Sequence, residues 1–209
     1  MPIRVLKGAK IAIEVKVKNL GIPYTFSSNS VVWRDSLVRY PEPKEGYRFS
    51  LGSGEEKVLK FYHLANEDGN WNVTAVLSDA GFRREKVVSN LFTVEPMKIV
   101  ETSYSSGIIS SFFCVALVQR IGDALKFGFS FGNAYKYTTI TSLKPKFWIN
   151  DKICFDTTLS VYIRPQYMLT CYTQEFPIVG LGDYVRSGTN VFKVYESSFA
   201  VGNSKSFTL

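Results

Sequence analysis

Residues 11–18 place a large apolar side chain at every second position, with Ile11, Ile13, Val15 and Val17 on one side and Glu14, Lys16 and Lys18 on the other. Successive side chains of a β-strand point to opposite faces, so this period of two predicts a strand with one buried and one exposed face. The segment Asn19-Leu20-Gly21, followed by Pro23, then ends the strand.

Similar short segments recur along the chain, separated by Gly, Asn, Asp and Pro. They predict strands at 3–6, 47–51, 58–62, 71–75, 91–94, 112–121, 125–131, 146–149, 152–155, 161–163, 168–173 and 191–195. Asn150-Asp151 predicts a tight hairpin turn, and residues 82–88 predict a single helical turn. Strand formers outweigh helix formers, so the sequence predicts an all-β protein.

Composition is consistent with folded sandwiches, because 45% hydrophobic and 21% charged residues exclude a disordered chain, collagen or a coiled coil. One constant shift in residue number carries Asn19 onto Gly132, Trp71 onto Tyr184 and Pro96 onto the end of the chain. Such a repeat indicates two copies of one module. We therefore expect two tandem antiparallel β-sandwiches, residues 1–96 and residues 97–209.

The strand Val15–Gly21, followed about fifty residues later by Asp68-Gly69-Asn70-Trp71, resembles the immunoglobulin-like modules of the CARDB type. These modules are common in archaeal and bacterial surface proteins. The resemblance covers residues 8–95 and, more weakly, residues 124–209, with Trp71 and Tyr184 as the corner aromatics. It implies an immunoglobulin-like or jelly-roll-like sandwich that binds or spaces, although the paired inter-sheet cysteines are missing from the first half.

The three cysteines are Cys114, Cys154 and Cys171. An odd, sparse set is not a disulfide framework, and no pair has the spacing of metal ligands. Three buried free thiols are the favoured interpretation. A disulfide between Cys154 and Cys171, on neighbouring strands, stays open as the alternative.

Catalytic motifs are absent from the sequence. His63 is the single histidine, no Gly-x-Ser-x-Gly motif surrounds a serine, and no glycine-rich phosphate loop occurs. The carboxylate pairs Glu55-Glu56 and Glu67-Asp68 are sequence neighbours, which do not face one another across a cleft. We expect a protein that is not an enzyme and that binds no cofactor or metal.

A net charge of +7 could favour binding of the negatively charged nucleic acids. The basic runs at 83–86 and 144–148 are short and are typical of solvated strand ends, so nucleic acid is disfavoured. The N-terminus lacks the features of a signal peptide, and the longest apolar run, at 108–118, is too short to span a membrane. Asn72-Val73-Thr74 is a glycosylation sequon with Asn72 expected to point outward.

Aromatic residues in loop-like sequence are the remaining signal, because Tyr and Trp outside strand cores are typical of protein interfaces and of sugar-stacking platforms. The candidates are Tyr24, Phe26, Trp33, Tyr135, Tyr137, Tyr162 and Tyr167. The alternative is ordinary packing beneath long loops.

The sequence therefore predicts a structural or interaction protein, a subunit that contacts other protein subunits in a large virion or extracellular assembly, such as a virion coat, turret or decoration protein. The alternative is a surface adhesion or carbohydrate-binding module with Trp33 and Tyr24 as its platform. An enzyme built around His63 is the third hypothesis.

Overall fold

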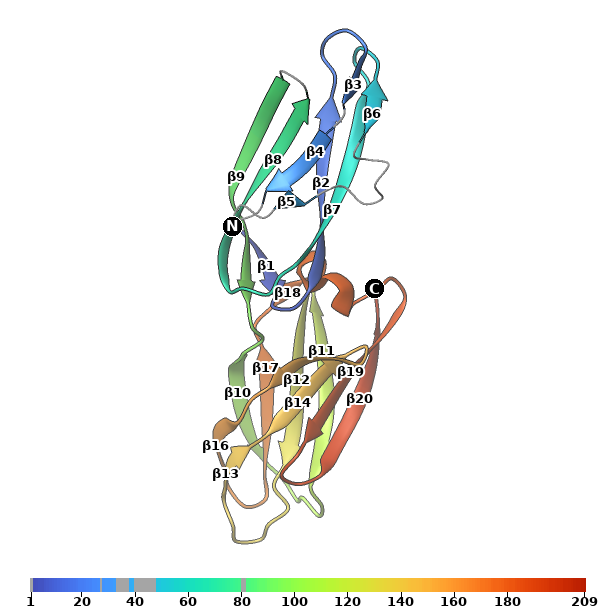
Figure 1. Ribbon diagram of the computed structural model, residues 1–209. Coiled ribbons are helices and arrows are strands. Elements are labelled where there is room, and N and C mark those ends of the chain that lie inside the picture. The colour runs from blue at the N-terminus through green and yellow to red at the C-terminus, as the bar shows by residue number, and fades with distance from the viewer. Residues whose placement is uncertain (1, 27, 33–37, 40–47, 80–81) are drawn as a thin grey trace. The chain divides into compact units, whose positions relative to one another are not determined.

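The computed structural model describes residues 2–26, 28–32, 38–39, 48–79 and 82–209 (Figure 1). The chain divides into two compact units, Met1–Glu95 and Pro96–Leu209. This division lies one residue before the expected boundary between residues 96 and 97.

The regular elements in the described part of unit 1 are all β-strands, and the expected all-β class is confirmed. Its strands are β1 (Ile3–Leu6), β2 (Lys10–Lys18), β3 (Tyr24–Phe26), β4 (Ser28–Val32), β5 (Val38–Arg39), β6 (Phe49–Leu51), β7 (Glu56–Leu64), β8 (Gly69–Asp79) and β9 (Phe82–Glu95). One sheet has the order β1-β9-β8-β4-β5, while β2 pairs with β7 and β3 with β6. The pairs are antiparallel except β1 and β9, which run parallel.

The core of unit 1 lies between the β2–β7 pair and the larger sheet. The predicted alternation in β2 is present, since Ile11 and Val17 are buried while Glu14 and Lys16 are exposed. The ring of His63 in β7 packs 4.9 Å from the ring of Trp71 in β8, which joins the two layers of a sandwich.

Unit 2, described in full, is also built from strands: β10 (Ile99–Ser106), β11 (Phe113–Ile121), β12 (Ala124–Gly132), β13 (Ile140–Leu143), β14 (Pro145–Ile149), β15 (Lys152–Asp156), β16 (Leu159–Ile163), β17 (Tyr167–Thr173), β18 (Phe176–Pro177), β19 (Thr189–Glu196) and β20 (Val201–Thr208). One sheet has the order β10-β17-β12-β11, with β18 on the end of β12, and the other has the order β15-β14-β19-β20. The strands β13 and β16 form a separate pair. A short helix α1 (Ile178–Leu181) and a 3₁₀ turn (Gly182–Tyr184) precede β19.

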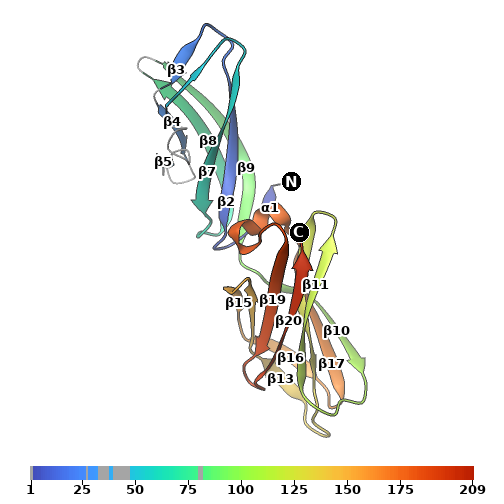
Figure 2. The same ribbon diagram turned by 90° about the vertical axis from the view of Figure 1, so that its right-hand side faces the viewer.

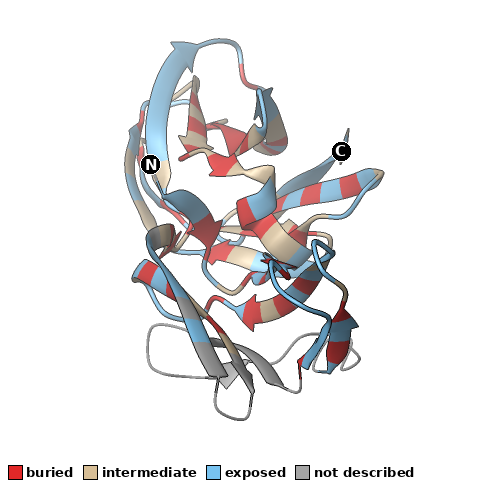
Figure 3. Cartoon of the chain, turned by 90° about the horizontal axis from the view of Figure 1, so that it is seen from above, coloured by how far each residue is buried: buried red, intermediate tan, exposed pale blue. Residues whose placement is uncertain are grey.

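Phenylalanine rings fill the space between the two sheets of unit 2. The ring of Phe127 in β12 lies 5.0 Å from that of Phe192 in β19, and Phe129 in β12 lies 5.8 Å from Phe147 in β14. Buried and exposed residues alternate strictly along β19, and Figure 3 shows such alternation as red and pale-blue bands along strands. Unit 2 is thus a second β-sandwich.

The local structure agrees with the predicted hairpin at Asn150-Asp151, where φ is 47° and 66° and the two residues join β14 to β15. The predicted helical turn at residues 82–88 is wrong. These residues belong to β9, where the ladder pairs Val88 with Val73 of β8. A continuous strand partner and β-branched side chains outweigh the local helical tendency.

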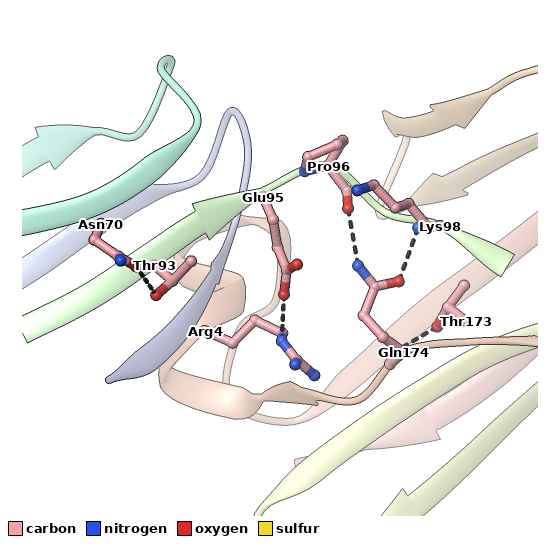
Figure 4. Close-up of polar contacts among 8 residues, drawn as sticks. All are labelled: Arg4, Asn70, Thr93, Glu95, Pro96, Lys98, Thr173 and Gln174. Atoms are coloured by element: carbon pink, nitrogen blue, oxygen red, sulfur yellow. Dashed lines mark hydrogen bonds and ion pairs between the residues drawn. The ribbon is translucent and has the colours of Figure 1, made fainter. Parts of the chain in front are cut away.

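Each unit fixes its own side of the division at residues 95 and 96 (Figure 4). In unit 1, Arg4 of β1 forms an ion pair with Glu95 at the end of β9. In unit 2, the Gln174 side chain donates from Nε2 to the carbonyl oxygen of Pro96 at 2.8 Å and accepts at Oε1 from the backbone N–H of Lys98 at 2.8 Å. Both ends of this segment are therefore held by named contacts within their own unit.

Candidate interaction surfaces at the loop ends

The loop between β2 and β3, residues 19–23, is held by the side chain of Asn19, which is buried. Its Nδ2 donates to the carbonyl oxygens of Ile22 at 2.8 Å and Leu51 at 3.0 Å, and its Oδ1 accepts from the N–H of Gly21 at 3.0 Å. A side-chain amide that satisfies backbone groups in this way fixes the path of a loop without any regular secondary structure.

The loop between β12 and β13, residues 133–139, is held in the same way by the fully buried Asn133. Its Nδ2 donates to the carbonyl oxygens of Thr138 and Ile163, both at 2.9 Å, and of Arg164 at 3.1 Å. Its Oδ1 accepts from the N–H of Tyr135 at 3.0 Å.

The backbones around the two asparagines also match. The N–H of Asn19 donates to the carbonyl of Glu55, and the N–H of Asn133 donates to the carbonyl of Tyr167. The residue before each of these acceptors is Gly54 or Gln166. Its N–H donates to the backbone carbonyl of the asparagine, and its backbone is left-handed, with φ of 79° for Gly54 and 60° for Gln166. The structure thus pairs Asn19 with Asn133, one residue beyond the Gly132 that the sequence shift gave.

In unit 1 the fixed loop exposes large apolar side chains: Leu20 is 83% exposed and Ile22 is 80% exposed. Beside them is a hollow of about 240 Å³, lined by Asn19, Gly21, Ile22, Tyr24 and Phe26. The ring of Phe26, one of the lining residues, packs 5.1 Å from the ring of Phe49. Pockets for small ligands usually exceed about 300 Å³, so this hollow suits a single side chain better than a cofactor.

In unit 2 the equivalent loop exposes Tyr137 by 82% and Tyr135 by 42%. The Tyr135 ring rests on an aromatic cluster, 4.9 Å from the ring of Phe112 and 6.3 Å from that of Phe199. The neighbouring loop between β10 and β11 leaves Ile108 fully exposed. We call the exposed set Ile108, Tyr135 and Tyr137 the unit 2 tip.

The other aromatic candidates fall into different places. Tyr167 begins β17 beside the Asn133 loop, and Tyr162 in β16 is 61% exposed next to Ile163, whose carbonyl Asn133 binds. The structure therefore brings four of the seven candidates to one end of unit 2. Tyr24 is 40% exposed at the hollow of unit 1.

Two candidates need separate comment. The prediction of Phe26 as an exposed interface residue is wrong, because the pairing of β3 with β6 places it against Phe49 with only 6% exposure. Trp33 lies outside the described residues.

The exposed apolar residues Leu20, Ile22 and Ile108 were missed by sequence reasoning. Their signal was apolar side chains placed between turn formers, as in Asn19-Leu20-Gly21-Ile22-Pro23.

The cysteines are unbridged, which corrects the candidate Cys154–Cys171 disulfide. Cys154 is in β15 and Cys171 is in β17, and these strands belong to different sheets. Burial raises the pKa of Cys114 and of Cys171 to about 12 and raises the pKa of Cys154 further. Thiols so far from ionisation are poor nucleophiles and poor metal ligands.

Three of the four carboxylates singled out in the sequence have structural partners. The Glu55 carboxylate accepts from the N–H of Gly52, and Glu56 forms ion pairs with Lys16 and Lys18 that lower its pKa. Asp68 pairs with Lys7 at 3.2 Å. Among the described residues, no group of three His, Cys, Asp or Glu side chains is arranged to hold a metal ion. No helix in the described part of the chain has the length and apolar character needed to cross a bilayer.

Comparison with known proteins gives no family. No known protein family matches the sequence, and no curated protein sequence matches it. Among solved structures, the chain is similar to red sea bream transglutaminase, at 12% identity and a TM-score of 0.33, over 98% of this chain and 29% of that one. It is also similar to the E. coli chaperone DraB, at 13% identity and a TM-score of 0.29, over 100% of this chain and 93% of that one.

Proposed function

We propose that this chain is a non-enzymatic interaction protein that binds other protein subunits of an assembly through the loop ends of its sandwiches. The observation that carries this proposal is the repeated use of one asparagine bond set to hold an exposed apolar loop, once in each unit. Loops held rigidly on a scaffold are frequent binding elements, because little conformational entropy is lost on association.

The exposed residues have the chemistry of a protein interface. Tyrosine is enriched among residues that dominate binding energy, and Lys136 lies 5.2 Å from the centre of the Tyr137 ring. Ile108 is fully exposed, so its burial by a partner lowers the free energy of the complex. We propose that the assembly is a virion or another extracellular structure, in which this chain is a coat, turret or decoration subunit.

Light scattering across concentration tests the proposal, with the chain alone and with candidate coat proteins added. The double variant Ile108→Ser/Tyr137→Ser should lose at least about tenfold in affinity for its partner. Val179→Ser is the matched control, because Val179 is 69% exposed but lies on α1, at the end of unit 2 opposite β13 (Figure 2). Equal losses in the control and the double variant would count against the unit 2 tip.

The alternative function is a carbohydrate-binding module, favoured by the hollow beside Tyr24. The amide of Asn19 in that hollow is engaged with the backbone at both its nitrogen and its oxygen, which leaves less capacity to bind sugar hydroxyls. Glycan-array screening of the wild type and of Tyr24→Ala distinguishes the two functions. Binding that disappears in Tyr24→Ala would favour the carbohydrate module, while silence of the array would remove it.

An enzyme centred on His63 has the least support. The His63 side chain is only 6% exposed and packs on Trp71, so a substrate has no direct access to it.

A further inference from the structure

Strand β10 is an open edge of unit 2. It pairs on one side with β17, and the ladders of unit 2, every residue of which is described, give it no partner on the other side. Seven of its eight residues are exposed, including Val100 at 57% and Tyr104 at 47%. An unpaired row of backbone N–H and C=O groups is a template for another strand.

The register shows which backbone groups are available. The N–H of Asn133 donates to the carbonyl of Tyr167, so the backbone groups of Tyr167 point toward β12. The backbone groups of the other odd-numbered residues of β17 therefore also point toward β12. The even-numbered residues of β17 therefore bond to their partners in β10, which are Glu101, Ser103 and Ser105. The N–H and C=O groups of Thr102, Tyr104 and Ser106 consequently point away from the sheet.

Several of the other edge strands carry the charged residues that ordinarily prevent such pairing, whereas the edge strands without charge, β3, β6, β13 and β16, are short, with five residues at most. Strand β20 has Lys205, β15 has Lys152, and β2 and β7 have several lysines. The eight residues of β10 include no Lys, Arg or Pro. Their one charge, Glu101, is neutralised within the unit by an ion pair with Lys126.

We propose that β10 pairs with β10 of a second copy of this chain, antiparallel, around a two-fold axis at Ser103. In this register Thr102 of each copy lies opposite Tyr104 of the other copy. The outward-facing backbone groups of these residues then form hydrogen bonds across the axis in both pairs. The register also spans residues 100–106, seven of the eight residues of β10.

The side chains of β10 are complementary to themselves in this register. Thr102 faces Tyr104 of the second copy on both sides of the axis, an aromatic and β-branched pair of the kind that stabilises sheets. Glu101 faces Ser105, and Val100 faces Ser106, so no like charges oppose one another. The contact is isologous and closes as a dimer, which distinguishes it from partner binding at the unit 2 tip.

Cysteine cross-linking tests the register. At the two-fold axis, Ser103 and its copy form a non-hydrogen-bonded pair, with Cα atoms about 4.5 Å apart, a separation that a disulfide spans. Ser103→Cys should give a covalent dimer under mild oxidation, at a rate at least about tenfold above that of Ser105→Cys, whose two copies lie four residues apart along the strands. Both variants carry Cys154→Ser, because Cys154 is partly exposed, while Cys114 and Cys171 are buried.

A proline pair tests the hydrogen bonds. Thr102→Pro removes an outward N–H, so it should abolish the dimer seen by light scattering while leaving the melting temperature of the monomeric unit nearly unchanged. Ser103→Pro is the matched control, because it removes a bond to β17 and should lower the melting temperature.

Three results would overturn the proposal. One is a wild-type chain that stays monomeric up to about 1 mM, a concentration where even a weak pair associates. Another is equal cross-linking of Ser103→Cys and Ser105→Cys. The third is protection of β10 amide protons that arises only when a different protein is added, which would assign this edge to a strand of that protein.

Discussion

Gln166 binds Ile109 through two hydrogen bonds, accepting at Oε1 from the Ile109 N–H at 2.8 Å and donating from Nε2 to the Ile109 carbonyl at 3.1 Å. A side-chain amide here supplies the same pair of bonds that a neighbouring strand would supply. The same Nε2 lies 3.3 Å from the carbonyl oxygen of Ala134. Gln166 therefore ties together the two loops that carry the unit 2 tip.

Two replacements of Gln166 should separate the stability lost with these hydrogen bonds from the strain of its left-handed backbone. Gln166→Ala removes the bonds and keeps a side chain at φ 60°, so we expect a loss of about 2 kcal/mol in the free energy of unfolding. Gln166→Gly should lose about 1 kcal/mol less, because glycine adopts this conformation without strain. Urea denaturation measures both, and equal stability of the two variants would contradict the role of backbone strain.

Asn19 and Asn133 should respond to mutation in parallel. Asn133→Ala leaves the N–H of Tyr135 and the carbonyl of Ile163 without their side-chain partner, so we expect a loss of about 3 kcal/mol. Asn19→Ala should cost slightly less, since Asn19 is 9% exposed and water reaches it more readily. Thermal unfolding of each variant measures the loss. If only one of the two variants were destabilised, the asparagine hydrogen bonds would not have the same role in both units.

Gly128 and Gly107 form a matched pair for testing close packing. A Cβ added at Gly128 in β12 would lie 2.2 Å from the carbonyl oxygen of Cys171, whereas a Cβ at Gly107 would meet no atom within 4 Å. Gly128→Ala should therefore destabilise the protein by about 3 kcal/mol, and Gly107→Ala should stay within about 0.5 kcal/mol of wild type. Chemical denaturation of both variants provides the comparison, and a stable Gly128→Ala would contradict the approach of β12 to β17.

The buried thiols predict the response of stability to alkaline pH. The ordinary pKa of a thiol is about 9, and burial raises the pKa of Cys114 and Cys171 to about 12. Between these values the unfolded chain releases protons that the folded chain retains, so stability is full below pH 9 and falls as the pH rises toward 12. Unfolding at stepped pH measures this slope.

A matched variant identifies the source of that slope. Cys114→Ala should show a shallower decline above pH 9 than wild type, despite a cavity cost that is independent of pH. In the native protein, thiol-specific reagents should modify Cys114 and Cys171 only after unfolding, because Cys114 is 3% exposed and Cys171 is fully buried, whereas Cys154 is partly exposed. Peptide mapping that finds fast modification of Cys114 or Cys171 in the native protein at pH 8 would contradict both expectations.

Local patterns predicted much of the fold, and long-range contacts explain where they did not. The alternation of β2 and the Asn150-Asp151 turn are local signals, and both are present in the structure. β10 and β20 were missed because they are rich in Ser, Thr, Asn and Gly and lack a buried apolar face, so their strand character comes from the partners β17 and β19.

The candidate surfaces were predicted only in part for the same reason. Tyr135 and Tyr137 were identified because tyrosines outside strand cores are typical of interfaces, and both are exposed. Leu20 and Ile22 are residue types usually found in a core, and their exposure depends on a loop path that the long-range bond of Asn19 to Leu51 helps to fix. Phe26 was misplaced because its burial depends on Phe49, far away in the sequence.

The two asparagine-held loops differ in length, with five residues at 19–23 and seven at 133–139, yet the bond from Oδ1 to the second following N–H is 3.0 Å in both. The bond from Oδ1 is therefore kept although the number of residues in the loop differs. Foreign peptide epitopes inserted between Gly21 and Ile22, or between Tyr135 and Thr138, would leave in place the carbonyl oxygens of Ile22 and Thr138 that accept from the two asparagines. The chain offers two such display positions, one in each unit.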